Sequence, residues 1–351
     1  MPLPFDPHHD LVALSLTPFG WRRNLGERLR GGEPPDVILH SFLTSKRLNR
    51  DGLDRSTLMS KVAAAFARAS DRGMHLIAWN DASYPAALSA ITDPPPALWV
   101  RGNSAALTSR AVAIVGSRAG SPYALAVAER LAAELSARGI VIVSGLARGV
   151  DSAAHRGTLS VNGATVAVLG SGADVIYPAE HRDLARQVES TGAIVSELVP
   201  GTPPQKQFFP LRNRIISGLS RAVLIVEAGE KSGSLITARM ALDQGREVLA
   251  VPGNVLSGRN RGGHALLKDG AKIVESADDI LEELGLPSTR TRSADRPEDP
   301  VLAGVPAGET CDLDVIAERT GLAPARLLTR LFELELAGSI RRVGGGRFAR
   351  V

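Results

Sequence analysis

Six short apolar runs between residues 111 and 250 constrain the fold more than any other feature, because stretches with helical spacing separate them. The runs are Ala111–Val115, Ile140–Val143, Thr165–Leu169, Ala193–Val195, Ala222–Val226 and Glu247–Ala250. Strands that alternate with helices build βαβ units, in which the strands lie parallel in one sheet. The sequence therefore predicts an α/β fold with a Rossmann-like, doubly wound and mostly parallel sheet.

The helix after the first run has clear boundary signals. Ser121 is a favoured N-cap, Pro122 suits the first helical position and Gly139 suits the position after the end. A second helix is expected from about Ser234 to Gln244, with Gly245 ending it. The expected buried stripe of the first helix consists of Leu125, Ala128, Leu131 and Leu135.

The rest of the chain divides where its composition changes. Residues 1–78 contain short helical patterns broken by Gly and Pro, which predict a small helical domain. A connector with three consecutive prolines leads into the sheet, and we take 79–286 as the sheet domain. Residues 287–303 are rich in Pro and charged residues, so we expect a flexible linker. Residues 304–351 show two helical patterns and then two strand-like pieces around three glycines, which predicts a winged helix.

Composition excludes several classes of protein. The single cysteine, Cys311, rules out an internal disulfide and a multi-cysteine zinc site. The first residues lack the charged and apolar regions of a signal peptide, and the apolar runs are far shorter than a membrane span of about 18 residues. We therefore expect a soluble, cytoplasmic protein without a membrane partner. The net charge of +4 over 351 residues is too small to indicate nucleic-acid binding, so its distribution matters more.

Glycines, hydroxyls and arginines follow the ends of the predicted strands. Because ligands bind a doubly wound sheet beyond the carboxyl ends of its strands, these residues are expected at one rim. Gly116 would let the backbone approach a ligand, Ser117 and nearby amides would bond phosphate, and Arg118 would add a planar cation. The alternative is an ordinary strand-to-helix turn with a surface arginine. A second candidate phosphate site, ahead of the later helix, consists of Lys231, Ser232 and Gly233.

The segment 201–221 gives the strongest local signal for nucleic-acid binding. Its positive residues contribute +4, equal to the net charge of the whole chain, and no acidic residue offsets them. Cations beside aromatic rings suit single-stranded nucleic acids, because cations neutralise phosphates and rings stack on exposed bases. We expect Phe208 to be in the core or partly buried and Phe209 to stack on a base. The positive residues are Lys206, Arg212, Arg214 and Arg221.

Two polar residues near these loops have two interpretations each. Asn213 either contacts a ligand or caps a helix expected to begin near Arg212. Arg148 either faces a ligand or braces Asp151, and the brace is favoured.

Enzyme signatures are not met. The phosphate-binding pattern G-x-x-x-x-G-K-[ST] is missing, and Gly116–Ser121 does not satisfy the dinucleotide pattern G-x-G-x-x-G. Glu197 and Glu227 follow strands, but helix capping or an internal ion pair is favoured over acid–base catalysis. His155 and His181 are expected to be structural or surface residues. We expect no catalytic residue, no cofactor and no metal.

Five motifs in this order resemble the DNA-processing protein A family, also called DprA or Smf. They are Val115–Arg118, Ser144–Asp151, Phe209–Ser220, Ser232–Ala238 and Val251–Asn254. The terminal winged-helix pattern is similar to the family's last domain, and the helical start is similar to its small SAM-like first domain. In that first domain Thr17-Pro-Phe-Gly-Trp21 stands in place of the family's Pro-Gly motif, which counts against a hairpin-type DNA contact there.

The resemblance implies a protein without catalytic activity that binds single-stranded DNA during natural transformation. Members protect the strand beside single-strand-binding protein and promote loading of the RecA recombinase for homologous recombination. A lysine that follows the Tyr-Pro pair in some members is replaced by Ala179, so Arg182 is the candidate substitute. Together with the loop analysis, the candidate DNA contacts are Gly116, Ser117, Arg118, Lys206, Phe209, Arg212, Asn213, Lys231, Ser232 and Gly233.

The resemblance also implies a homodimer formed by the sheet domain. Residues 263–273 are similar to the family's dimer segment, with His264, Leu267 and Ile273 as candidate contacts. Burial within the monomer core is the alternative for each of them.

Two other functions compete with DNA-strand binding. A nucleotide-processing enzyme of the lysine-decarboxylase-like type would share the sheet, but its Gly-Gly-x-Gly-Thr loop is not supplied by residues 228–234. A winged-helix transcription regulator would need a basic recognition helix, yet Arg326 and Arg330 stand beside Glu333 and Glu335. Protein or auxiliary contact is therefore favoured over duplex reading for the terminal domain.

Overall fold

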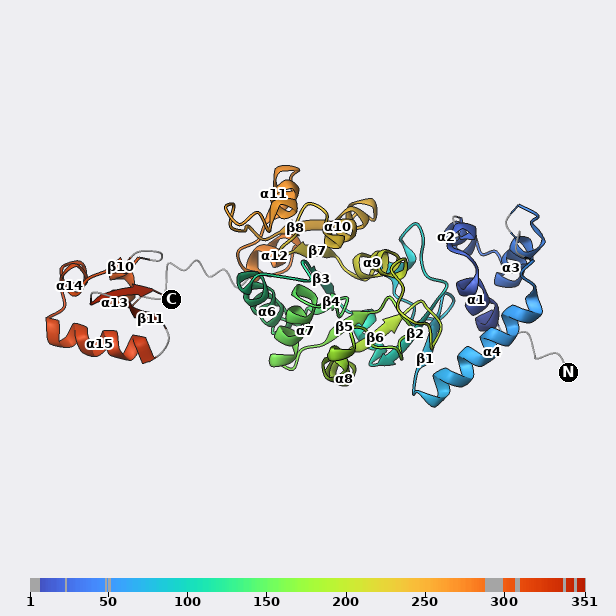
Figure 1. Cartoon of the computed structure of the whole chain (residues 1–351), viewed down its shortest axis with the longest axis horizontal. Helices are drawn as coiled ribbons and strands as arrows, with labels where there is room; N and C mark the ends of the chain where they lie inside the picture. The colour runs from blue at the N-terminus through green and yellow to red at the C-terminus, as the bar shows by residue number, and fades with distance from the viewer. Residues whose placement is uncertain are drawn as a thin grey trace. The chain divides into compact units, whose positions relative to one another are not determined.

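The computed structural model describes residues 7–22, 24–47, 49, 52–287, 299–306, 310–336, 339–343 and 346–350. The chain forms two compact units, residues 1–288 and 289–351, and each is treated by itself (Figure 1). In the described part of the chain, no helix has both the length and the apolar character needed to cross a membrane.

A nine-stranded sheet forms the centre of the first unit, with the order β1-β2-β6-β5-β4-β3-β7-β8-β9. From β6 to β9 all neighbouring strands are parallel, whereas β2 pairs with β1 and with β6 in antiparallel register. From β3 the chain builds outward first on one side and then on the other, so the doubly wound, mostly parallel sheet is confirmed. The strands are β1 His75–Ala78, β2 Ala97–Gly102, β3 Ala111–Val115, β4 Val141–Ser144, β5 Thr165–Val168, β6 Ala193–Ser196, β7 Ala222–Ile225, β8 Glu247–Ala250 and β9 Lys272–Ile273.

Three strands toward the two edges of this sheet, β1, β2 and β9, were not predicted from the sequence. β1 lies inside the range assigned to the helical domain, and β2 lies in the connector after the three prolines. β1 and β9 are too short to show an alternating pattern, and β2 is buried on both faces and does not alternate either.

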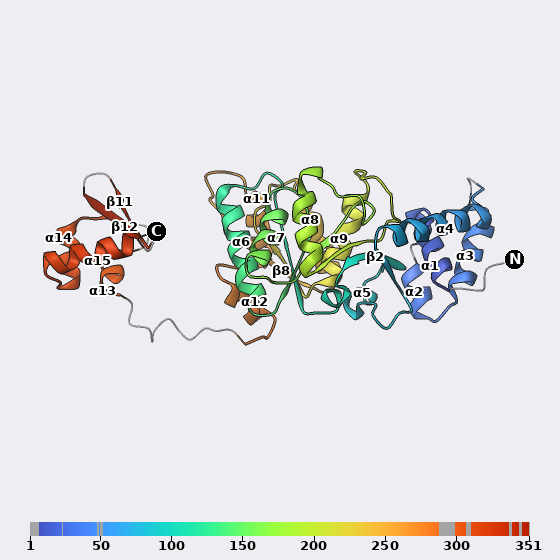
Figure 2. The ribbon, with the colours of Figure 1, turned by 90° about the horizontal axis from the view of Figure 1, so that it is seen from below.

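Helices cover both faces of the sheet, because alternate residues of each strand point in opposite directions. Val112 and Ile114 of β3 pack in one core with α6 Pro122–Ser136, α7 Val150–Ser160 and α12 Ala277–Glu283. Ala113 and Val115 pack in another core with α9 Phe208–Leu219 and α10 Gly233–Asp243. Figure 1 shows α10 and α11 on one side of the sheet and α6 and α7 on the other, and Figure 2 shows α12 beside α6. The remaining helices of this part are α5 Ala86–Ser89, α8 Arg182–Thr191 and α11 Arg261–Lys268.

The predicted helix boundaries are confirmed. Ser121 is the N-cap of α6, where its side chain accepts a hydrogen bond from the Ala124 amide at 3.2 Å. Pro122 is the first residue of α6. Gly139 and Gly245, which follow α6 and α10, both have positive φ angles, as the reversal of the chain after a helix requires.

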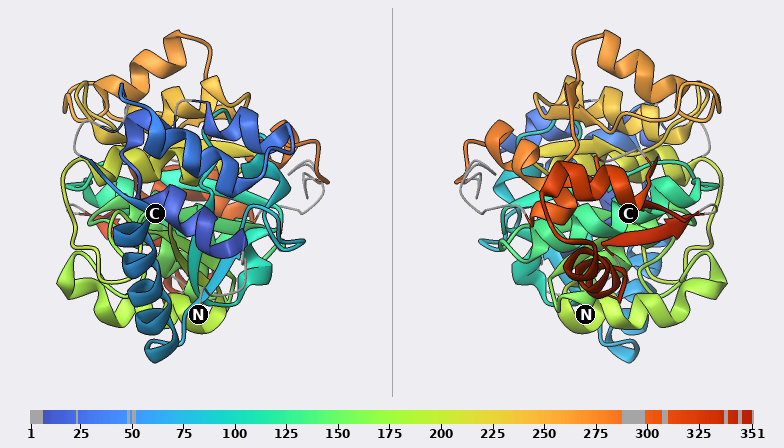
Figure 3. Two further views of the ribbon diagram at one scale, coloured as in Figure 1. Left: turned by 90° about the vertical axis from the view of Figure 1, so that its right-hand side faces the viewer. Right: turned by 90° about the vertical axis from the view of Figure 1, so that its left-hand side faces the viewer.

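The N-terminal part of the first unit consists of short helices, as predicted. Their apolar faces form a core that continues onto the sheet through Trp99 of β2 and Ile194 of β6. The helical part therefore packs directly on the sheet, and Figure 3, left, shows its helices in blue. The domain boundary at residue 78 stays a prediction. The helices are α1 Pro7–Leu16, α2 Leu25–Arg30, α3 Pro35–Thr44 and α4 Arg55–Asp71.

The second unit has the helices and strands of a winged helix. α14 Leu313–Thr320 and α15 Pro324–Leu336 match the two predicted helices, with Gly321 at a positive φ of 67° between them. The strands form the order β10-β12-β11, and Gly344 and Gly345 of the predicted wing lie outside the described residues. α13 Pro300–Gly304 occupies the end of the predicted linker, whose residues 288–298 also lie outside the described part. The strands are β10 Thr310–Cys311, β11 Ile340–Val343 and β12 Arg347–Arg350.

Candidate functional site

A pocket of about 860 Å³ opens at the carboxyl ends of the central strands of the sheet. Its walls come from the loops that follow β3, β4, β5, β6 and β7, and β3 and β7 are the neighbouring strands at which the winding direction changes. All ten candidate DNA contacts line this pocket, so their predicted convergence on one rim is confirmed. Whether these residues touch a nucleic acid stays a prediction.

The loop after β3 is shaped by contacts within the protein. A Cβ atom on Gly116 would lie 2.8 Å from Val150 and 3.0 Å from the carbonyl oxygen of Glu227. The glycine is therefore required by the packing of the chain itself, and not only by a ligand. The Ser117 amide donates to the Glu227 carbonyl at 2.7 Å, so this amide is not available to phosphate. The Ser117 Oγ accepts from the Ala119 amide at 3.2 Å, which leaves its O–H to donate into the pocket.

Three exposed cations line the pocket. Among the described residues, Lys206 and Lys231 have no ion-pair or hydrogen-bond partner for their ammonium groups, and Arg118 has none for its guanidinium. The Arg118 guanidinium lies over the Phe209 ring, 5.1 Å from its centre. Asp151 is the one carboxylate among the lining residues, and Arg212 beside it offsets its charge. The pocket therefore carries uncompensated positive charge, which suits a phosphate chain.

Arg212 is directed into the fold and not toward solvent. Its guanidinium donates to the carbonyl oxygens of Gly145 and Val168, and its Nε donates to Asn213 Oδ1 at 3.1 Å. Its Nη2 lies 3.8 Å from Asp151 Oδ2. The side chain is 8% exposed. These contacts give Arg212 a role in shaping the pocket, and its direct contact with phosphate stays a prediction.

The buried carboxyl of Asp151 depends on Arg212. Desolvation raises the pKa of Asp151, and the neighbouring Arg212 opposes this shift. The predicted brace between Arg148 and Asp151 is wrong. Arg148 instead pairs with Glu180 at 2.5 Å on the surface, because its side chain points outward while Asp151 lies in the first turn of α7 and accepts the Gly145 amide.

Asn213 does not cap a helix. α9 begins at Phe208, five residues earlier, so Asn213 lies in the helix interior and the capping interpretation is wrong. Its Nδ2 donates to the Gly233 carbonyl at 3.5 Å and thus joins α9 to the start of α10. Ser232 caps α10, and its hydroxyl lies 2.7 Å from that of Ser234. The positive end of the α10 dipole therefore faces the pocket beside Lys231.

Two aromatic rings form one wall of the pocket. Phe209 is half-buried, with Tyr177 on one side at 5.6 Å between ring centres and Arg118 over its face. Phe208 is also half-buried and does not line the pocket. The sequence analysis overlooked Tyr177, which is 42% exposed; its one signal was an aromatic residue in the loop after β5. Arg182, the candidate substitute for the lysine of other members, does not line this pocket and lies at a separate hollow with Glu189.

The two glutamates have the structural roles that were favoured. Glu227 accepts hydrogen bonds from the amide and hydroxyl of Ser121 at 3.1 and 2.6 Å, and so holds the start of α6. Glu197 forms buried ion pairs with Arg22 and Arg214. Neither glutamate is among the residues that line the pocket.

The histidines are structural, as expected. His155 is fully buried in α7, where its Nδ1 lies 2.8 Å from the Thr165 hydroxyl. Burial lowers the pKa of the His155 imidazole from 6.5 to about 3, with smaller contributions from Arg212 and other cations. His181 Nδ1 is hydrogen-bonded to the Leu146 carbonyl at 2.8 Å.

His155 is expected to make the protein less stable in acid. Because the folded state keeps the imidazole neutral between pH 6.5 and 3 while the unfolded state protonates it, the free energy of unfolding falls as the pH falls through this range. The loss is about 1.4 kcal/mol per pH unit. The free energy of unfolding of His155→Gln, measured by urea titration at pH values between about 6 and 4.5, should depend less on pH than that of the wild type. The difference should be about 1.4 kcal/mol per pH unit. In the wild type, the folded and the unfolded state both hold a neutral imidazole at about pH 8, so the difference in unfolding free energy between wild type and variant at that pH measures the packing cost alone. An equal dependence of the unfolding free energy on pH in both proteins would contradict the assignment.

The candidate dimer residues differ in exposure. His264 is half-buried, and its Nε2 is hydrogen-bonded to the Gly253 carbonyl at 3.0 Å within the same chain. Leu267 is also half-buried. Ile273 is 57% exposed on β9, at the open edge of the sheet. The edge strand therefore presents an apolar side chain, and the dimer itself stays a prediction.

The recognition-helix position of the second unit exposes apolar side chains beside its arginines. α15 exposes Leu328 and Phe332, by 46% and 60%. Arg330 of the same helix is engaged by Asp299 at 2.7 Å and by Glu333. This arrangement favours contact with a protein over reading of duplex DNA.

Comparisons with known proteins cover most of the chain. Residues 75–285 match the family described as DNA recombination-mediator protein A, and residues 287–346 match the DprA winged helix domain. The chain is 45% identical over 285 residues to protein Smf of Escherichia coli K12, covering 78% of this chain and 76% of that protein. It is 43% identical over 227 residues to DNA processing protein DprA of Bacillus subtilis, covering 64% and 75% respectively.

Two solved structures are also similar. The X-ray structure of DNA processing protein A from Streptococcus pneumoniae has a TM-score of 0.66 and 33% identity, over 80% of this chain and 99% of that chain. DNA processing protein A from Helicobacter pylori has a TM-score of 0.55 and 31% identity, over 60% of this chain and 95% of that chain. The Helicobacter structure concerns that protein's mode of binding single-stranded DNA.

Proposed function

The chain belongs to the DNA recombination-mediator protein A family, which confirms the resemblance seen in its sequence, and from this premise we propose that it binds single-stranded DNA in the pocket beyond β3 and β7. One observation carries the proposal. Within the described part of the chain, Arg118, Lys206 and Lys231 are exposed and have no ion-pair or hydrogen-bond partner for their charged groups, and they surround a pocket with the half-buried ring of Phe209 in its wall. The DNA binding that the Helicobacter pylori structure describes supports the same role here.

The pocket offers separate groups for the backbone and for the bases of a strand. The cations, the Ser117 hydroxyl and the start of α10 bind phosphate oxygens. Phe209, with Tyr177 beside it, stacks on a base that has left the regular stack. In a duplex the bases are paired and stacked, so they do not reach a ring held inside a pocket. The site therefore discriminates by strandedness and not by sequence.

The proposal extends to the partners of the family. The bound strand is protected, RecA recombinase is loaded on it for recombination during natural transformation, and single-strand-binding protein acts on the same strand. A homodimer forms through the sheet domain around His264, Leu267 and Ile273. The protein acts in the cytoplasm, carries out no chemical step and needs no cofactor.

A competition experiment tests the proposed binding. A labelled single-stranded oligonucleotide bound to the full-length protein is challenged with an unlabelled single strand or with the duplex of the same sequence. The single strand should displace the probe at a much lower concentration than the duplex. Equal or better competition by the duplex would favour the winged-helix transcription regulator. In a separate assay, turnover of nucleotides detected by chromatography would favour the nucleotide-processing enzyme.

Replacing Phe209 by alanine should weaken single-strand binding by about 1–3 kcal/mol, because the variant lacks a stacking surface. Fluorescence anisotropy with an oligonucleotide of fixed sequence measures the change. Phe208→Ala is the matched control, since Phe208 neighbours Phe209 in α9 but does not line the pocket. Equal losses of affinity in both variants would assign Phe209 to packing alone.

A further inference from the structure

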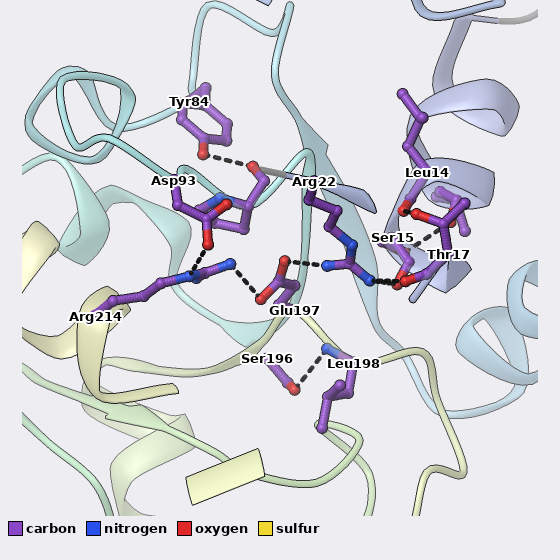
Figure 4. Close-up of polar contacts among 12 residues, drawn as sticks. Leu14, Ser15, Thr17, Arg22, Tyr84, Asp93, Ser196, Glu197, Leu198 and Arg214 are labelled. Carbon is purple, nitrogen blue, oxygen red and sulfur yellow. Dashed lines mark hydrogen bonds and ion pairs between the residues drawn. The ribbon is translucent and has the colours of Figure 1, made fainter. Parts of the chain in front are cut away.

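The segment Thr17–Trp21, which replaces the Pro-Gly motif of the family, packs against the sheet unit. Phe19–Trp21 forms one turn of 3₁₀ helix after α1, and Thr17 closes α1 by donating its hydroxyl to the Leu14 carbonyl at 2.7 Å. Arg22 follows directly and is 4% exposed. Figure 4 shows its guanidinium between Glu197 and the carbonyl oxygens of Ser15 and Thr17 at the end of α1.

Arg22 joins the helical part to the sheet. Its Nη1 donates to Glu197 Oε1 at 2.8 Å, and its Nη2 donates to the carbonyl oxygens of Ser15 and Thr17. Glu197 directly follows β6, at the beginning of the segment that leads into α9. One buried guanidinium therefore bonds both to the end of α1 and to the carboxyl end of a sheet strand.

The same carboxylate continues the network into α9. Glu197 Oε2 accepts from Arg214 Nη2 at 2.7 Å, and Arg214 Nε donates to Asp93 at 3.2 Å (Figure 4). The Phe19 ring lies beneath both arginines, with the guanidinium carbons of Arg22 and Arg214 at 4.3 and 5.5 Å from its centre. Two cations, a shared carboxylate and a ring thus connect the Thr17–Arg22 segment to α9.

α9 is held from two sides by arginines two positions apart. Residues at this spacing point to different sides of a helix. Arg212 bonds to Gly145 directly after β4 and to Val168 at the end of β5, whereas Arg214 bonds to Glu197 and so to Arg22. Phe209 lies one turn earlier on the same helix.

We propose that Phe19 and Arg22 are positioning residues, which hold α9 so that Phe209 faces a nucleic-acid strand in the pocket. The expected effect on DNA binding rests on the proposed function, whereas the attachment of α9 is measurable without DNA. The helical part of the chain then contributes to strand affinity without touching the strand.

Hydrogen exchange of the full-length protein tests the attachment. In Phe19→Leu, which keeps apolar bulk but removes the ring beneath the two cations, the amides of residues 208–219 should exchange about 2- to 30-fold faster. Arg22→Gln should have a larger effect of the same kind, and Phe19→Leu keeps the test usable where Arg22→Gln fails to fold. Unchanged exchange in α9 of Phe19→Leu would overturn the proposal.

Arg28→Gln is the matched control. Arg28 also pairs with a carboxylate, Glu33, and lies over a ring, Phe42, at 5.4 Å, but these partners all belong to the helical part. Its removal should leave exchange in α9 unchanged. Faster exchange in α9 of all three variants would show a general loss of stability and would overturn the positioning role.

To test the effect on DNA binding, the same variants are titrated with a single-stranded oligonucleotide and binding is followed by fluorescence anisotropy. Single-strand affinity should fall about 2- to 30-fold in Phe19→Leu and Arg22→Gln and not in Arg28→Gln. In a Phe209→Ala background, Arg22→Gln should weaken binding little further, because it acts through that ring. Fully additive effects would overturn the inference while leaving the proposed function intact. If the wild-type protein bound no single strand, the proposed function would fail, and the exchange measurement would still decide how α9 is held.

Discussion

Replacing Arg212 by leucine should lower the free energy of unfolding by about 3–5 kcal/mol, because the change leaves a buried carboxyl group without its cation. Asp151 is 5% exposed and lies 3.8 Å from the Arg212 guanidinium. The Gly145 and Val168 carbonyl oxygens are also left without this donor in the variant. Urea unfolding followed by circular dichroism measures the change.

Arg221→Leu is the control for Arg212→Leu. It removes the same charge from the same basic segment, but Arg221 is exposed and lies directly before β7. Its free energy of unfolding should therefore change by less than about 0.5 kcal/mol. If Arg212→Leu were as stable as wild type and only its DNA affinity fell, Arg212 would be a phosphate contact, as its motif first suggested.

Reversing the charge of Lys206 should weaken single-strand binding by about 2–3 kcal/mol, which is roughly 30- to 150-fold. Lys206→Glu removes one charge-assisted hydrogen bond to phosphate and adds repulsion. The side chain is exposed and has no partner within the described structure, so unfolding by urea should not change. Salt titrations should show a log-affinity slope flatter by about 0.7 for each phosphate that the variant no longer neutralises.

Lys61→Glu provides the control for Lys206→Glu. Lys61 is exposed on α4, away from the pocket, and its reversal changes the net charge of the protein equally. Its salt slope and affinity should stay near those of wild type. An equal fall in affinity in both variants would mean that net charge alone, and not this pocket, attracts the strand.

Much of the sheet was predictable because buried parallel strands appear in a sequence as short apolar runs. β3, β7 and β8 begin at the predicted residues, since an arginine directly precedes each of these runs. The meeting of Gly116, Lys206 and Lys231 followed from topology alone, because parallel strands place their carboxyl ends at one edge.

The partners of individual arginines were not predictable. Arg148 and Arg212 have the same chemistry, yet one side chain points to solvent and the other into the fold. That difference depends on backbone direction at the end of β4 and on the start of α9, which pattern reasoning placed four residues too late. The Arg22–Glu197–Arg214 network joins residues far apart in the chain, so no local spacing reveals it.

Photo-crosslinking tests the central claim most directly. A bromouracil-substituted single strand is irradiated with the full-length protein, and the modified peptides are identified by mass spectrometry. We expect crosslinks in the peptides that contain Phe209 and Tyr177, and we expect these crosslinks to disappear in Lys206→Glu at the same DNA concentration. Crosslinks confined to residues 299–350, with none around the pocket, would contradict this claim.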